Sequence, residues 1–260
     1  KQKNKMTAWK FSSKKNLKFN KPIFIEGLPG LGNVGKIAVD VLVEELDARK
    51  VIDVFSHSLP NSVFVNEDNL VELPKIEFYH KNIKGQDFLF LTGDVQPIEE
   101  TASYKFTENV LDVIQKHGCN EIVTIGGIGI NEEPIKPKVF CTGNELAFVK
   151  EFSKYKVDTN LYGIVGPIIG VSGLLVGLSK RRKMKAASLL VETLGHPMYI
   201  GLRGAKEVLK VLNKKYGFQV PLKNLNKEIK RFDEENGSNT TTKHATINKL
   251  KRYKEMTYIG

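Results

Sequence analysis

Cysteine, tryptophan and long hydrophobic runs are scarce in this chain of 260 residues, which has two cysteines and one tryptophan. Two cysteines, Cys119 and Cys141, are too few for a disulfide framework, so we expect both to be buried apolar side chains in a reducing compartment, the cytoplasm. The longest apolar stretch, residues 161–178, is interrupted by five glycines and one proline. It therefore does not resemble the roughly 20-residue helix that crosses a bilayer, and no signal-peptide pattern is visible. We expect no membrane partner.

The sequence also lacks the compact motifs of several enzyme classes. No Cys/His cluster has the spacing of a zinc site, and neither G-x-S-x-G nor H-E-x-x-H occurs. A nucleotide-binding Walker motif is excluded because Ile37 follows Lys36, where a Ser or Thr would hold magnesium. We therefore predict no cofactor, no metal and no catalytic residue, and we interpret the chain as a binding protein.

Positive charge is concentrated in two places, although the net charge of the whole chain is +11. Residues 1–21 hold eight lysines and no acid, and residues 180–185 read K-R-R-K-M-K. Nucleic acid is one explanation of such charge. Few aromatic residues accompany it, however, and no DNA- or RNA-binding motif appears. We favour solvated surface lysines and do not expect a nucleic-acid partner, whereas an acidic protein partner would be steered by the same charge.

A glycine-rich turn dominates residues 21–50. An apolar strand is predicted over residues 23–25, and apolar residues then recur at helical spacing from Val34 to Leu46. Strand, turn and helix in this order predict the opening of a βαβ unit. Between them, Gly30, Gly32 and Gly35 fit the spacing G-x-G-x-x-G.

Two interpretations of this turn are open. A glycine turn that leads into a helix N-terminus can cradle a phosphate. Alternatively, the glycines let the helix pack closely on the sheet. The dinucleotide fingerprint requires an acidic residue at the end of the second strand, which is predicted over residues 51–55. Asp53 lies in the middle of that strand, so we favour the packing interpretation.

Beyond the turn, strand and helix patterns alternate, which is typical of an α/β fold. Strands are predicted at residues 63–65, 70–72, 76–80, 86–92, 121–125, 139–142 and 186–193, with a loop over 127–138. Helices are predicted at residues 99–117, 174–182, 205–216, 222–235 and 244–260, and one capped by Asn144 continues to about Lys154. We divide the chain into a basic arm (1–20) that pairs as an edge strand near its end, a core domain (21–217), and a helical, basic extension (218–260).

Several polar or glycine positions follow predicted strands and could share one crevice at the sheet edge, where open α/β sheets bind ligands. The candidates are Gly30, Gly32, Asn33, Asp94, Gln96 and Glu192. The alternative is turn chemistry, in which Asp94 and Gln96 satisfy loop backbone groups. Glu192 and His196 come closest to an acid–base pair, but His196 and His57 have the sequence context of ordinary loop residues.

Six sequence blocks, in this order, resemble the proteasome assembly chaperone family, in particular its second-subunit branch and archaeal homologues. The resemblance covers about residues 22–216. The blocks are G-L-P-G-L-G-N-V-G-K-I-A (27–38), S-H-S (56–58), G-D-V-Q-P (93–97), T-I-G-G-I (124–128), G-P-I-I-G-V-S-G-L-L (166–175) and L-L-V-E-T-L-G-H (189–196).

This resemblance implies a three-layer α/β/α sandwich with a mixed, phosphorylase/hydrolase-like sheet and a C-terminal helical extension. It also implies a non-enzymatic scaffold that binds proteasome α-subunits and associates with itself, as a trimer to pentamer, or with a paralogue. The alternative function is nucleoside or phosphate-type binding, or hydrolase-like chemistry, in the candidate crevice.

Members of the family often end in a hydrophobic residue, Tyr and any residue, and that tail docks between α-subunits through its terminal carboxylate. Here the matching residues are Thr257, Tyr258 and Ile259. Because Gly260 follows them, Tyr258 is third from the end of this sequence rather than second, and Thr257 is only weakly hydrophobic.

Overall fold

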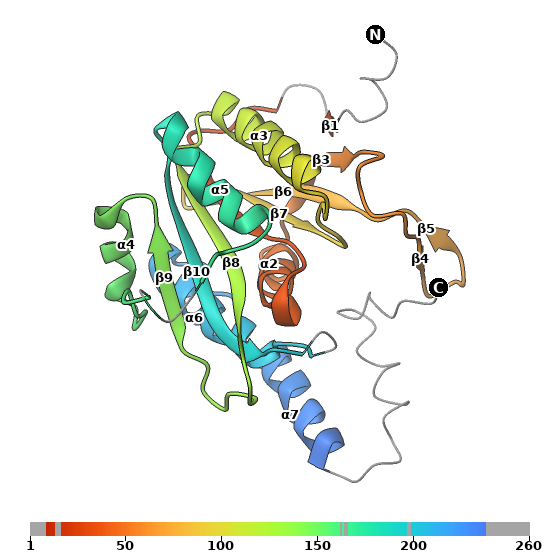
Figure 1. Ribbon diagram of the computed structural model, residues 1–260, viewed down its shortest axis with the longest axis vertical. Helices are drawn as coiled ribbons and strands as arrows, with labels where there is room; N and C mark the ends of the chain where they lie inside the picture. The colour runs from red at the N-terminus through yellow and green to blue at the C-terminus, as the bar shows by residue number, and fades with distance from the viewer. Residues whose placement is uncertain (1–8, 14–16, 162, 164–165, 197–198, 238–260) are drawn as a thin grey trace.

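The computed structural model (Figure 1) describes residues 9–13, 17–161, 163, 166–196 and 199–237. An eight-stranded mixed sheet runs through the molecule in the order β1-β3-β6-β7-β2-β8-β10-β9, and β4 and β5 form a separate hairpin. The strands are β1 (Lys10–Ser13), β2 (Ile23–Gly27), β3 (Arg49–Phe55), β4 (Phe64–Val65), β5 (Val71–Glu72), β6 (Ile76–Ile83), β7 (Gln86–Gly93), β8 (Glu121–Ile130), β9 (Val139–Gly143) and β10 (Lys185–Leu194).

Helices cover both faces of this sheet, and two separate apolar clusters fill the two interfaces. One face is covered by α2 (Val34–Glu45), α4 (Leu146–Ser153), α6 (Leu202–Tyr216) and α7 (Lys223–Gly237). The opposite face is covered by α3 (Glu100–Lys116) and α5 (Val171–Ser179), which lie side by side in Figure 1. Successive residues of a strand point to opposite faces, so each central strand serves both clusters. The predicted three-layer α/β/α architecture is confirmed.

The strand that follows α2 does not return beside the strand that precedes it. β2 pairs in parallel with β7 and β8, whereas β3 pairs antiparallel with β1 and β6. Because β6 is in turn antiparallel to β7, β3 runs in the same direction as β2 but two strands separate them. The predicted βαβ unit is therefore interrupted by β6 and β7, which lie between its two strands. In a dinucleotide-binding fold the second strand ends beside the glycine turn, and here it does not.

The predicted loop over residues 127–138 is wrong in its first part, because β8 continues to Ile130. All ten residues of β8 pair with β10 in parallel register. The glycines in this strand allow other backbone segments to approach it. A Cβ on Gly127 would lie 2.3 Å from the carbonyl oxygen of Leu31, in the turn before α2. A glycine-rich strand segment thus marks a close backbone approach rather than a loop.

Asn144 does not cap α4, and that prediction is also wrong. The N-cap position belongs to Glu145, whose side chain makes no capping hydrogen bond. Asn144 instead ties β9 to the start of β10: its Nδ2 donates to Met184 O at 2.9 Å, and its Oδ1 accepts from Ala186 N at 2.8 Å. Asn144 therefore fixes a strand connection rather than a helix end.

The N-terminal arm contributes an edge strand as predicted, but at Lys10–Ser13 in the middle of the arm rather than near its end. β1 pairs antiparallel with β3 and forms one border. Beside it, the ring of Trp9 is buried with its centroid 4.7 Å from that of Phe106 in α3. At the other end of the described chain, Leu225 and Ile229 of α7 are buried in the cluster that contains α6. The predicted helix over residues 244–260 and the Tyr258 tail lie outside the described residues.

Candidate functional site

The glycine turn brings α2 into backbone contact with the sheet. A Cβ added to Gly27 would lie 2.1 Å from the carbonyl oxygen of Gly35, and one added to Gly35 would lie 2.4 Å from that of Ile125. Neither glycine can carry a side chain without separating the helix from the strands. These distances support the packing interpretation of the turn.

The middle of the turn is held against β10 and the start of α6. Gly32 and Asn33 both adopt left-handed backbone conformations, with φ values of 64° and 50°. The carbonyl oxygen of Gly32 accepts a hydrogen bond from Gly201 N at 2.8 Å. A Cβ added to Gly32 would lie 2.4 Å from Thr193 Oγ1 of β10. Gly30 is different, because its φ is −159° and no atom lies within 4 Å of the position of a Cβ.

Gln96 joins the glycine turn to the start of α5. Its Nε2 donates to Pro29 O at 2.6 Å, while its Oε1 accepts from Val171 N at 3.2 Å. One side chain thus satisfies a backbone group 67 residues before it and another 75 residues after it. Gly170 permits this arrangement, since a Cβ there would lie 2.7 Å from Gln96 Oε1. The amide of Gln96 is occupied by the fold itself.

Asp94 belongs to a small network at the carboxyl end of β7. Its Oδ2 accepts from Lys75 N at 2.8 Å, and its Oδ1 lies 3.7 Å from Lys36 Nζ. Lys36 also pairs with Asp40 at 3.0 Å, and Asp40 accepts from Thr92 Oγ1 at 2.6 Å. The structure thereby brings Asp94 close to α2, as its place after a strand predicts.

Glu192 lies apart from Asp94. It is on β10, which β2 and β8 separate from β7, so three interstrand spacings of about 4.8 Å divide it from the strand that leads to Asp94. Its Oε2 accepts from Lys138 N at 2.9 Å, next to the start of β9. His196 is exposed after β10, and the ring of His57 lies 5.4 Å from that of Phe55.

A buried carboxyl that the sequence analysis missed lies on the strand before the glycine turn. Glu26 is fully buried, and its Oε1 accepts from Leu28 N at 2.9 Å. Burial raises the pKa of Glu26 from 4.5 to about 7, while the hydrogen bonds from Leu28 and Ser172 partly oppose the shift. The available signal was one acidic residue within an otherwise apolar strand, I-F-I-E-G.

Glu26 begins a polar row across the sheet. Glu26 is opposite Thr124 of β8, and Thr124 is opposite Ser188 of β10. Each of the three carries a buried oxygen for which the described residues provide no hydrogen-bond partner: Glu26 Oε2, Thr124 Oγ1 and Ser188 Oγ. All three residues are 0% exposed, so a solute cannot reach them in this conformation. The row is a polar interior and not an open site.

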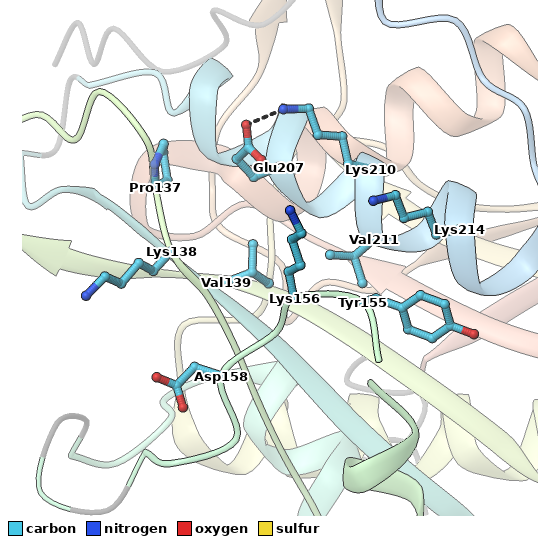
Figure 2. Close-up of a pocket in the computed structure, with 10 residues that line it drawn as sticks. All are labelled: Pro137, Lys138, Val139, Tyr155, Lys156, Asp158, Glu207, Lys210, Val211 and Lys214. Carbon is cyan, nitrogen blue, oxygen red and sulfur yellow. Dashed lines mark hydrogen bonds and ion pairs between the residues drawn. The ribbon is translucent and has the colours of Figure 1, made fainter. Parts of the chain in front are cut away.

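A lysine-lined pocket, here called the lysine groove, lies at the opposite border of the sheet from β1. It has a volume of about 540 Å³ and is formed by the start of β9, the segment after α4, and α6. Its lining residues are Pro137, Lys138, Val139, Tyr155, Lys156, Asp158, Glu207, Lys210, Val211 and Lys214. Figure 2 shows Lys156 extending toward Glu207 and Lys210 of α6.

Positive charge exceeds negative charge in the lysine groove, because four lysines face two carboxylates. Glu207 is paired with Lys210 at 2.7 Å. Within the described ranges, the ammonium groups of Lys138, Lys156 and Lys214 take part in no ion pair. Tyr155, which is partly exposed, adds apolar surface beside these charges, whereas Val211 beneath it is buried in the core. The groove is therefore suited to an acidic segment that also carries apolar side chains.

Two kinds of feature are absent from the part of the chain that the structure describes. No group of three or more His, Cys, Asp or Glu side chains there could hold a metal ion. None of the helices in the described ranges is both long enough and apolar enough to cross a bilayer.

The sequence matches the model of the PAC2 family over residues 24–236. The chain belongs to the PAC2 family. Two curated relatives come from Methanocaldococcus jannaschii. This PAC2 chain is 28% identical to its uncharacterized protein MJ1210 over 225 residues, an alignment that covers 82% of this chain and 84% of that protein. The protein MJ0106 of the same organism is 27% identical over 230 residues, an alignment that covers 87% of this chain and 88% of MJ0106.

Solved structures of two Pyrococcus furiosus proteins share the fold. PbaB, described as an archaeal proteasome activator, superposes with a TM-score of 0.81 at 30% identity, over 88% of this PAC2 chain and 97% of PbaB. PbaA, described as an archaeal homolog of proteasome-assembly chaperone, gives a TM-score of 0.75 at 26% identity, over 94% of both chains. The resemblance found in the sequence is confirmed at the level of the family and the α/β fold.

Proposed function

We propose that this PAC2-family chain is a non-enzymatic chaperone or scaffold that binds proteasome α-subunits, assists or regulates proteasome assembly, and acts as a homo-oligomer. The observation that carries the proposal is the likeness to PbaB, an archaeal proteasome activator, along 88% of this chain. PbaA, a homolog of proteasome-assembly chaperone, supports the same role over 94% of the chain.

The geometry of the candidate crevice argues against turnover of a small molecule there. Gly27, Gly32 and Gly35 are packed against neighbouring segments. Gln96 and Asp94 already hydrogen-bond to backbone groups of the fold. A small-molecule site would need these groups to be released, and the best-buried carboxyl, Glu26, is closed to solvent. The crevice residues therefore act as structural contacts in this proposal.

The C-terminal tail is the proposed contact with the α-subunits. In this proposal Thr257, Tyr258 and Ile259 dock between two α-subunits, and the terminal carboxylate pairs with a lysine there. Capture of a chain-terminal carboxylate is a known mode of peptide recognition. Because Gly260 shifts Tyr258 by one position, a chain that ends at Ile259 should bind more tightly than one that ends at Gly260.

Co-purification with archaeal proteasome α-subunits tests the proposal. We expect the full chain to bind at micromolar concentration. Tyr258→Ala should weaken binding at least tenfold, because loss of an anchoring aromatic ring typically costs about 1.4 kcal/mol or more of binding free energy. Tyr253→Ala, which changes the same residue type five positions earlier, is the matched control and should bind normally. Absence of binding by the full chain rejects the proposed partner, and equal losses in both variants reject tail docking.

A further inference from the structure

The β4–β5 hairpin exposes an unusual amount of apolar surface. We call residues 63–73 the acidic hairpin. Five of its apolar side chains are each between 54% and 68% exposed: Val63, Val65, Leu70, Val71 and Leu73. A two-stranded hairpin has little stability alone, and contiguous exposed apolar residues commonly mark a protein contact. The hairpin is therefore a candidate for burial against another polypeptide.

The tip of the acidic hairpin is ordered by its own polar contacts. Asn66 Oδ1 accepts hydrogen bonds from Asp68 N at 3.0 Å and Leu70 N at 2.9 Å, and Asn66 Nδ2 donates to Glu72 Oε1 at 2.9 Å. These bonds hold the tip in one shape before any partner binds. A preformed tip loses less conformational entropy on docking than a flexible one.

The charge of the acidic hairpin is opposite to that of the molecule as a whole. Residues 63–73 contain three carboxylates, Glu67, Asp68 and Glu72, and no basic residue, in a chain of net charge +11. Glu72 pairs with Lys75. Glu67 and Asp68 are exposed, and their carboxylates form no ion pair with the described residues. The partner that suits the hairpin is a basic surface with apolar patches.

The lysine groove on the same molecule has these properties. Its Lys138, Lys156 and Lys214 are unpaired within the described ranges, and the partly exposed ring of Tyr155 provides apolar contact surface. It cannot take the hairpin of its own chain. The hairpin connects β3 and β6 near one border of the sheet, whereas the groove lies against β9 at the other border. Figure 1 shows the hairpin and β9 on opposite sides of the molecule.

We propose that the acidic hairpin of one copy docks into the lysine groove of a second copy, with Glu67 and Asp68 against Lys156 and Lys214. This inference rests on the homo-oligomeric part of the proposed function and names the surfaces that make it. Because the two surfaces differ, the contact is head-to-tail. Such a contact repeats from copy to copy and closes into a ring when the rotation between copies permits.

Charge reversal on each surface, and then on both, tests this contact without any proteasome subunit. Glu67→Lys/Asp68→Lys and Lys156→Glu/Lys214→Glu should each place like charges in contact and reduce the mass measured by light scattering to that of one chain, 29.2 kDa. The variant with all four substitutions restores opposite charges across the contact, so its mass should return to that of the unmodified oligomer. An equimolar mixture of the two double variants should also associate.

Lys105→Glu/Lys116→Glu is the matched control, because it makes the same charge change on exposed lysines of α3. It should keep the unmodified mass. Circular dichroism and a thermal melt identify any variant that loses its mass by unfolding. The proposal is overturned by an unmodified chain that stays monomeric, by double variants that keep the full mass, or by a folded four-substitution variant that remains monomeric. Binding of α-subunits is measured separately, so rejection of that partner leaves the result for this contact unaffected.

Discussion

A carboxyl group in the interior of a protein is difficult to ionise, because no solvent stabilises its charge. Glu26 is such a group, and its pKa of about 7 lies above the 4.5 of the unfolded chain. Between these two pH values the folded protein retains a proton that the unfolded chain releases. The stability linked to this proton is fully present below about pH 4.5 and is lost as the pH rises to about 7.

Glu26→Gln should remove this pH dependence. Glutamine keeps an oxygen that can accept from Leu28 N, but it never has to ionise. A shift from 4.5 to about 7 corresponds to roughly 3 kcal/mol. We therefore expect the free energy of unfolding of the unmodified chain to fall relative to that of the variant as the pH rises from 5 to 8. Urea unfolding at both pH values measures this difference.

The surface variant Glu132→Gln, in the exposed segment after β8, is the control for this experiment. Its unfolding curve should follow that of the unmodified chain at both pH values. A Glu26→Gln curve that also runs parallel to the unmodified chain would show that Glu26 is ionised in the folded protein at pH 5.

Between elements, the decisive contact is the backbone approach of α2 to the sheet. Gly27→Ala would place a methyl group where the carbonyl oxygen of Gly35 lies, 2.1 Å from the new Cβ. Since helix and strand must then separate, we expect a loss of about 1–3 kcal/mol in the free energy of unfolding, measured with urea.

Gly30→Ala is the matched substitution three residues later. Gly30 has an extended φ of −159° and no atom within 4 Å of the position of a Cβ, so we expect a change of no more than about 0.5 kcal/mol. Equal losses in Gly27→Ala and Gly30→Ala would contradict the packing interpretation.

Local periodicity predicts most elements of this fold because their patterns are complete within one segment. The helix from Val34, the strand before Asp94 and the two short strands at residues 63–65 and 70–72 all follow from residue types alone. The extension of β8 was missed because Gly126, Gly127 and Gly129 have low strand propensity, and only pairing with β10 makes that segment a strand. Such long-range pairing leaves no local signal.

The candidate site could be predicted only as far as strand order was known. Gln96 was correctly placed near the glycine turn, where it contacts Pro29. Glu192 lies within β10, paired with Ile128 of β8, and the sequence does not reveal that two strands separate β10 from β7. Glu26 was missed because a single acidic residue in a strand is usually interpreted as a solvent-facing position. Its neighbours across the sheet, which determine its burial, come from remote segments.

For the whole molecule, the distribution of charge predicts how self-association responds to salt. The proposed contact joins the acidic hairpin to the lysine groove, so its attraction is electrostatic in part. Raising the salt concentration from about 0.1 M to 1 M shortens the screening length from about 10 Å to about 3 Å. We expect the dissociation constant of the oligomer to rise at least tenfold, as measured by sedimentation equilibrium. An oligomer that is equally stable or more stable in high salt would contradict the charge pairing.

Both outer borders of the large sheet are blunted. At one border, β1 is four residues long and carries Lys10. At the other, Asp158 covers part of β9: its amide donates to Val139 O at 2.9 Å, and its carbonyl accepts from Cys141 N at 2.8 Å. Copies of the protein are thus directed away from backbone ladder growth, the route by which sheets fuse into insoluble fibrils. Removing residues 1–13, and β1 with them, would expose the amides of β3 that β1 now pairs and would permit such growth.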